Sequence, residues 1–491
     1  MVPLLILFLL VRLLALWILP PDGDEISFLY IAEDIAHRRQ WPIYFYDQQV
    51  IGPLPSYLFA PLFRLFGFSF WGARLYHGIL YLVFAALLLK VIREFFGEEL
   101  RNRTFLLLTF LPYPMIFFTT VIGWTDILLL ALVSFILLLR ICDENKKAFG
   151  ATFLLGVVCG ISIWRSPLFL VWLVPIASSV LWLVPGSWRR GVPWVCLLGF
   201  LIGLFPVGLY GLHSGTLMST EGHGGPLLIN FGDGLRMVYL FFARLKYFLF
   251  TFPYGLASSS VEFLVRWLSL IPLTIFALSF LSFLVSFARS KESPAPQRNI
   301  FSLFMLIPPV VLLIAYCSRN LVRGDEGMRF LVPLLIPYAF CIAWWLGRIQ
   351  AAFLRRAVLG LLIGILVWGY AFPLQWAWTT RTELSRVAQF LESHDLRYGM
   401  ANFRTAYALN ILTDHRVLAT PLPGHAINRS LWAKVKSAGP RFLILDKANP
   451  EFRNRLARDS HLKQARVGPY DIFYGESSFL ARLLSSRGLV I

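Results

Sequence analysis

The stretch VPLLILFLLVRLLALWILPPDGDE, residues 2–25, joins an apolar run directly to a short acidic turn. A hydrocarbon core of ~30 Å takes about 20 helical residues, so the run is long enough to cross a membrane. The run lacks a basic start and a small-x-small cleavage site. These features predict a retained first membrane span, not a removed signal peptide.

The rest of the chain repeats this apolar character. Of its 491 residues, 57% are hydrophobic and 15% are charged, and the apolar residues fall in long runs. This composition predicts a mainly α, polytopic membrane protein with about eleven transmembrane helices. The expected spans are 2–19, 72–92, 104–120, 125–141, 149–164, 167–184, 192–212, 263–288, 300–317, 329–346 and 355–374.

The charged residues are distributed unequally between the two sides of the membrane that the expected spans define. With Met1 in the cytoplasm, Arg and Lys gather in the inward gaps, as the positive-inside rule requires. We therefore expect a multi-pass protein of the cell inner (plasma) membrane with its acidic turn outside. Topology explains much of the formal charge of +18, and no nucleic-acid-binding module is visible, so we expect no nucleic-acid partner.

The sequence predicts two domains. Residues 1–374 form a transmembrane domain with external loops at 20–71 and 213–262, the first carrying interfacial helices. Residues 375–491 have the composition of a soluble domain, placed outside the membrane by the odd number of spans. RYGMA, RFLILD and YDIFYG are read as strands and TAYALNIL as a helix, which predicts a small extracytoplasmic α/β domain.

Several motifs resemble one enzyme family. YIAEDIA, WPIYFYDQQVIGPLPSYLFAPLFRLFG and ARLYHGILYL, behind the acidic turn, are similar to the membrane-embedded C-type (GT-C) glycosyltransferases, which include protein O-mannosyltransferases and lipid A aminoarabinose transferases. The resemblance implies a polyprenyl-phosphate-linked sugar donor and a catalytic carboxylate at Asp24, with Glu25 beside it. The aminoarabinose branch carries Lys-Pro-Pro where this chain reads Ile51, Gly52 and Pro53, so its lysine has no counterpart.

Transfer of a sugar from such a donor needs a base for the acceptor hydroxyl and cations for the departing phosphate. Arginine is suited to the second task because its planar guanidinium can donate two parallel hydrogen bonds. Outward cations near span ends are not explained by topology, and their other interpretation is a snorkelling side chain or a structural ion pair. The expected phosphate-binding residues are Arg74, Arg165, Arg319, Arg323, Arg329 and Lys246.

A second group of polar residues is expected to bind the acceptor or its sugar. Asp126, at the head of a span, either binds the acceptor, holds a divalent cation with Asp24, or caps its helix. YFYDQQ offers hydroxyl and amide groups at Tyr46, Asp47, Gln48 and Gln49, or is a polar loop between interfacial helices. No cofactor is required, a divalent cation is left open, and the metal ligands are unknown.

The sequence thus predicts an inverting integral-membrane glycosyltransferase. Its partners would be the polyprenyl-phosphate-sugar donor, membrane lipid, and a lipid, glycan or protein acceptor. A multi-span transporter or a lipid or glycan flippase is the alternative. It predicts charges near mid-bilayer, whereas here the charges cluster at the outward ends of the spans, with Arg12 as the main exception. The chain has no G-x-x-x-x-G-K-[ST] loop, which disfavours a nucleotide sugar as the direct donor.

Overall fold

The computed structural model describes residues 2–19, 21–45, 51–120, 124–143, 149–183, 191–214, 234–251, 259–289, 296–316, 325–422, 429–445, 456, 461–475 and 480. Contacts divide the chain into two compact units. The first comprises Met1–Trp17, Val50–Gly52 and Arg74–Pro373, and the second comprises Ile18–Gln49, Pro53–Ala73 and Leu374–Ile491. Most of the first external loop therefore groups with the C-terminal region, and the predicted functional division at residue 374 stays a prediction.

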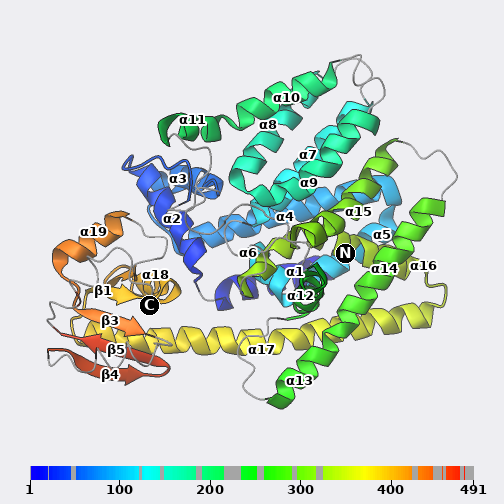
Figure 1. Cartoon of the computed structure of the whole chain (residues 1–491). Helices are drawn as coiled ribbons and strands as arrows, with labels where there is room; N and C mark the ends of the chain where they lie inside the picture. Colours follow the sequence, from blue (N-terminus) through cyan, green and yellow to red (C-terminus); the bar gives the residue numbers. More distant parts are fainter. Residues whose placement is uncertain are drawn as a thin grey trace. The chain divides into compact units, whose positions relative to one another are not determined.

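The first unit is built from helices (Figure 1). Three helices contain residues of both units, because α1 ends at Ile18, α4 begins at Phe70 and α17 continues to Ser393. The helices are α1 (Val2–Ile18), α4 (Phe70–Phe96), α5 (Glu98–Thr109), α6 (Tyr113–Thr120), α7 (Thr125–Asp143), α8 (Phe149–Arg165), α9 (Leu170–Ser178), α10 (Val192–Gly203), α11 (Phe205–Ser214), α12 (Gly234–Phe248), α13 (Ser259–Leu268), α14 (Leu270–Arg289), α15 (Pro296–Tyr316), α16 (Leu335–Arg348) and α17 (Ala352–Ser393), with shorter turns η1 (Pro167–Phe169), η2 (Ser179–Leu183) and η4 (Asp325–Leu334).

The multi-pass character is confirmed, but the count of eleven spans is not. Among the described residues, five helices are long and apolar enough to cross a membrane, or seven if two bent pairs each count as one span. The span expected at 104–120 is divided into α5 and α6 near Pro112, which has no amide hydrogen to continue the helical ladder. The span expected at 355–374 belongs to the 42-residue helix α17, the long yellow helix of Figure 1.

Helices α8 and α10 pack with their backbones in contact. A Cβ added to Gly156 would lie 2.0 Å from the carbonyl oxygen of Cys196, and one added to Gly160 would lie 2.3 Å from that of Phe200. On α10, Gly199 and Gly203 face the α8 backbone in the same way. Glycines four residues apart on both helices allow this approach, as in other membrane helix pairs.

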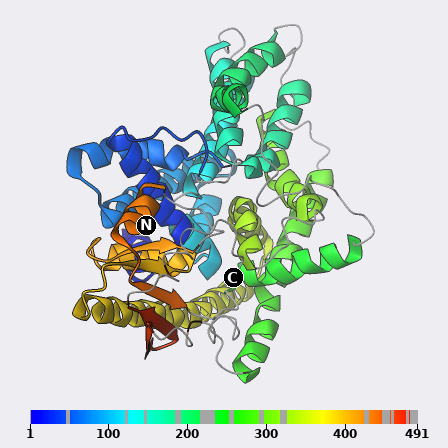
Figure 2. The same ribbon diagram turned by 60° about the vertical axis from the view of Figure 1, so that its left-hand side comes forward.

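The second unit combines two N-terminal helices with an α/β region. A five-stranded sheet has the order β2-β1-β3-β5-β4; β1 is parallel to β2 and β3, and β5 is antiparallel to β3 and β4. Its strands are coloured from yellow-gold through orange to red in Figures 1 and 2. The elements are α2 (Gly23–Ala36), α3 (Leu54–Phe66), β1 (Tyr398–Ala401), α18 (Phe403–Leu412), β2 (Leu418–Pro421), α19 (Arg429–Ala438), β3 (Phe442–Leu445), β4 (Lys463–Val467) and β5 (Tyr470–Tyr474).

Apolar residues from three strands and from α17 form the core of this α/β region. Ala401, Ile444 and Ile472 from β1, β3 and β5 pack with Val387 and Leu391 from the end of α17. The helix predicted in TAYALNIL and the strands predicted in RYGMA, RFLILD and YDIFYG are confirmed as α18, β1, β3 and β5. The sequence prediction missed α19 and the strands β2 and β4.

Candidate active site

The acidic turn at the start of α2, residues 22–25, is held by a capping box. The side chain of Asp22 accepts a hydrogen bond from the backbone N–H of Asp24 at 3.0 Å, and the backbone N–H of Asp22 donates to Oε2 of Glu25 at 3.3 Å. This reciprocal arrangement satisfies amide groups that have no partner inside the helix. Two of the three carboxylates in the turn therefore have a structural task.

The three carboxylates also differ in exposure. Glu25 is completely buried, whereas Asp22 and Asp24 are partly exposed. The Asp24 carboxylate takes no part in the capping box, and it lies in the first turn of α2, where the helix dipole favours negative charge. Asp24 thus combines a fixed backbone with a side chain that solvent reaches.

The acidic residues further along α2 form ion pairs with Arg39. Arg39 lies 3.3 Å from Asp34 and 3.7 Å from Glu33, measured from guanidinium nitrogen to carboxylate oxygen. Asp34 is buried and Glu33 is partly exposed. Their pairing with Arg39 assigns them to the C-terminal end of α2, away from the capped turn.

In the first unit, two predicted site residues contact each other. The Arg165 Nε donates a 2.7 Å hydrogen bond to the Asp126 Oδ2, and both side chains are buried. The other oxygen of Asp126 accepts from the backbone N–H of Ile127 at 2.9 Å. Asp126 lies at the start of α7 and Arg165 at the end of α8, so these packed helices bring both to one end of the pair.

Three other predicted cations are described in the first unit. Arg74 is buried, and its Nη1 donates to the carbonyl oxygen of Leu16 at 2.9 Å, near the C-terminal end of α1. Lys246 Nζ lies 4.7 Å from the ring centroid of Tyr247, and burial together with Arg266 lowers the pKa of this lysine. Arg329 in η4 lies 5.3 Å from the ring of Phe330. Each contact is structural, and none tests a phosphate-binding role.

The remaining predicted site residues lie outside the described part of the chain. In the residues that the structure describes, no group of three His, Cys, Asp or Glu side chains is arranged to hold a metal ion. The divalent cation that the sequence leaves open stays untested, and Asp126 contacts Arg165. The undescribed candidates are Tyr46, Asp47, Gln48, Gln49, Arg319 and Arg323.

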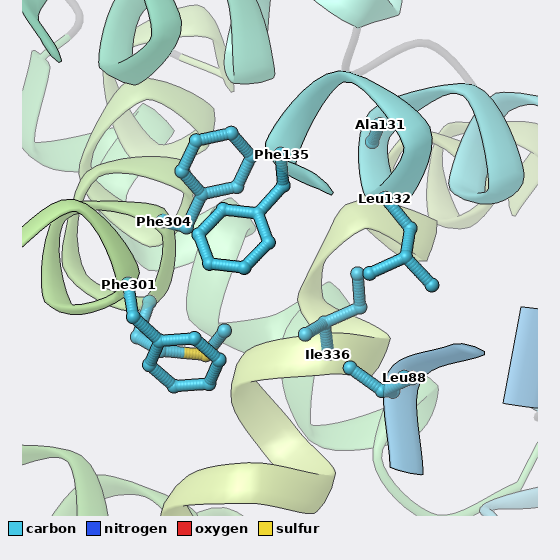
Figure 3. A pocket seen from close by; sticks show the side chains of 8 residues that line it. Leu88, Ala131, Leu132, Phe135, Phe301, Phe304 and Ile336 are labelled. Atoms are coloured by element: carbon cyan, nitrogen blue, oxygen red, sulfur yellow. The ribbon is translucent and has the colours of Figure 1, made fainter. Parts of the chain in front are cut away.

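A hollow in the first unit has no polar lining. Figure 3 shows apolar side chains from α4, α7, α15 and α16 turned toward it. Without a hydrogen-bonding or titratable group, this hollow offers no acid, base or phosphate ligand. Its lining residues are Leu88, Ala131, Leu132, Phe135, Phe301, Phe304, Met305 and Ile336.

Comparison with known families bears on the same part of the chain. Residues 51–210, about a third of the sequence, match the family described as dolichyl-phosphate-mannose-protein mannosyltransferase. The match confirms the GT-C resemblance. The matched stretch runs from before α3 into α11 and includes Arg74, Asp126 and Arg165. It begins after the acidic turn, so it leaves the role of Asp24 untested.

No curated protein matches this chain. Among solved structures, apo ArnT from Cupriavidus metallidurans is 14% identical, with 96% of this chain and 97% of that chain covered and a TM-score of 0.48. The apo Archaeoglobus fulgidus oligosaccharyltransferase is 12% identical, with coverages of 90% and 69% and a TM-score of 0.48. The arabinofuranosyltransferase AftD from Mycobacteria is 13% identical, with coverages of 96% and 40% and a TM-score of 0.47. These similarities are too low to carry an argument about function.

Sequence reasoning missed two features of the candidate site. The first is the capping box, although Asp22 followed by Glu25 has its spacing and could have been recognised in the sequence. The second is the Asp126–Arg165 pair, although both residues are expected at the outward ends of consecutive spans. Contacts between α2 and the C-terminal region had no signal in a single sequence.

Proposed function

We propose that the chain is a membrane glycosyltransferase that moves a sugar from a polyprenyl-phosphate donor to the hydroxyl group of an extracytoplasmic acceptor, with inversion at the sugar carbon. The observation that supports this proposal most is that the three carboxylates of the acidic turn differ in their contacts and exposure. Asp22 and Glu25 cap α2, while the partly exposed Asp24 carboxylate lies outside the capping box. The family match over residues 51–210 supports the reaction class.

In the proposed reaction, Asp24 takes the proton from the acceptor hydroxyl. The acceptor oxygen forms a bond to the anomeric carbon, and the bond from that carbon to the phosphate oxygen breaks. The electron pair of the broken bond leaves with polyprenyl phosphate, so that charge develops where cations can stabilise it. Glu25 is a weaker candidate for the base, because it is buried and hydrogen-bonded to the backbone of Asp22.

The remaining assignments stay proposals. Cations that bind the departing phosphate come from Arg74, Arg165, Arg319, Arg323, Arg329 and Lys246, although Asp126 already balances the charge of Arg165. Tyr46, Asp47, Gln48, Gln49 and Asp126 are the candidates for contacts to the sugar or the acceptor. The protein is proposed to lie in the cell inner membrane with its N-terminus in the cytoplasm and its C-terminal domain outside.

The test uses the full chain in lipid with a panel of polyprenyl-phosphate sugars. Asp24→Asn should lower the rate of polyprenyl phosphate release by about 10²- to 10⁴-fold, the usual contribution of a general base. Glu33→Gln is the matched control, because it removes the same charge from a partly exposed carboxylate of the same helix and should leave the rate nearly unchanged. Full activity of Asp24→Asn would refute its assignment as the base. Lipid or solute flux without transfer from any donor would favour a transporter.

A further inference from the structure

The α/β region of the second unit contacts the helix that carries Asp24. Helix α18 packs against α2, and the ring of Phe403 lies over Gly23, the first residue of α2. A Cβ added to Gly23 would lie only 2.3 Å from Cε1 of Phe403. Only a residue without a Cβ allows the ring to approach the acidic turn this closely.

Polar contacts reinforce this packing at both ends of α18. At its start, Arg404 lies 3.8 Å from the Oδ2 of Asp22, the residue that caps α2. Near its end, the Nδ2 of Asn410 donates a 3.0 Å hydrogen bond to the hydroxyl oxygen of Tyr30 on α2. Asn410 and Tyr30 are both buried, so this bond is shielded from competing water.

Asn410 is itself fixed to the sheet. Its Oδ1 accepts from the backbone N–H of Ala419 at 2.7 Å, and its Nδ2 also donates to the carbonyl oxygen of Ala419 at 3.0 Å. Aromatic rings fill the space beside it, with Tyr407 centred 5.4 Å from Tyr30 and Phe403 centred 5.2 Å from Tyr407. The contacts thus form a continuous path from strand β2 through α18 to α2.

We propose that α18 is a positioning element for the proposed reaction, with Phe403, Arg404 and Asn410 holding the acidic turn so that the Asp24 carboxylate stays in its reactive place. This inference rests on the proposed function of Asp24. It assigns the C-terminal domain a positioning task in the proposed reaction. Displacement of a reacting group by about 1 Å can cost on the order of 10²-fold in rate, so loss of this support should lower kcat.

The size of residue 23 provides the test. Gly23→Ala forces the Phe403 ring away and should lower kcat by about 10- to 100-fold, with the KM for the donor changing less than about twofold. Gly23→Ala combined with Phe403→Ala relieves the clash but also removes the ring that supports the turn, so kcat should stay below that of the wild type. Gly360→Ala in α17 is the matched control, because no atom lies within 4 Å of the position of its new Cβ.

Hydrogen exchange gives a readout that requires no activity. In Gly23→Ala, the amides of Asp24 and Ile26, which donate to Asp22, should exchange faster, while amides of β1 and β3 keep their protection. If Gly23→Ala does not fold, Tyr30→Phe removes only the hydroxyl that accepts from Asn410 and should lower kcat about threefold, the equivalent of one neutral hydrogen bond.

Two results would overturn the positioning role. One is unchanged kcat in both Gly23→Ala and Tyr30→Phe. The other is faster exchange at Asp24 and Ile26 with no loss of kcat, which would show that the contact is only structural. Full activity of Asp24→Asn would refute the proposed function instead, and the exchange measurement would then decide separately whether α18 holds the turn.

Discussion

The acidic turn of α2 and the buried pair of α7 and α8 both place a carboxylate in the first turn of a helix, with different results. Asp126 is buried, and its two oxygens are occupied by Arg165 and by a backbone amide. Asp24 is partly exposed, and the capping tasks around it are performed by Asp22 and Glu25. The Asp126 carboxylate thus neutralises a buried cation, whereas the Asp24 carboxylate lies outside the capping hydrogen bonds of its helix and is reached by solvent.

Substitutions at the acidic turn and at the buried pair should therefore affect different properties of the protein. At Asp24, we expect activity to fall without loss of stability. At Asp126 and Arg165, we expect stability to fall first, because a buried charge without its partner is costly. Three further substitutions test this contrast, from the largest expected effect to the smallest.

Arg165→Met should reduce stability most. It leaves the buried Asp126 carboxylate without its cation, and breaking such a pair costs about 3–5 kcal/mol. Thermal unfolding in detergent should show a clearly lower Tm than the wild type. The double variant Asp126→Leu with Arg165→Met is the control, and its Tm should return close to that of the wild type, since well-packed apolar residues often replace a buried pair at no net cost. A double variant as unstable as the single would show that the pair has another essential role.

Asp22→Ala should have a moderate effect on the acidic turn. The substitution removes the oxygen that accepts from the amide of Asp24, and loss of such a cap costs about 1 kcal/mol. Hydrogen exchange at the Asp24 amide should become faster, and Tm should fall slightly. Asp22→Asn keeps an accepting oxygen at the cap and should behave almost like the wild type; equal loss in both variants would contradict the capping role.

His415 should give the smallest effect, confined to acidic pH. Its ring packs against Tyr30 and Phe68, with centroids 5.9 and 5.1 Å away. Burial lowers its pKa below the ordinary value of 6.5, Lys434 lowers it further, and Glu33 and Asp414 act in the opposite direction. Below pH ~6.5 the unfolded chain therefore binds more protons than the folded one, so stability falls as the pH decreases toward the folded pKa.

The comparison variant for this prediction is His415→Asn. Position 415 has a φ of 60°, and Asn is among the residues that adopt this left-handed conformation most readily. The variant should retain its Tm between pH 7 and 8 and lose less stability than the wild type between pH 6.5 and 4.5. Identical pH profiles for the two proteins would show that His415 does not contribute to the acid sensitivity.

Much of the fold could be predicted because long apolar runs and short buried strands have clear patterns. The runs around residues 2–19 and 72–92 became α1 and α4, and RFLILD became β3. The exposed edge strand β4 was missed because its residues KQARV have too few apolar side chains to show a buried strand. The apolar span and the polar residues that follow it form one helix, α17, from Ala352 to Ser393. The sequence does not indicate this, because the two halves of the helix differ in composition.

The candidate site was less predictable, because its geometry depends on contacts between distant residues. The acidic turn was recognised from local sequence, but the division of tasks between Asp22, Asp24 and Glu25 depends on which carboxylate reaches which amide. The pairing of Asp126 with Arg165 required knowledge of which helices are neighbours. No local pattern predicts that Phe403 lies over Gly23.

The hydrogen bond between Tyr30 and Asn410 joins residues separated by 380 positions. During synthesis, the helix that carries Asp24 therefore leaves the ribosome long before the residue that anchors it. The acidic turn receives its support only after almost the whole chain has been made and α18 has folded beside β2. A chain that stops before Phe403 would carry the acidic residues of the turn without this anchor, so full activity should be acquired late in biogenesis, as the last step of assembly.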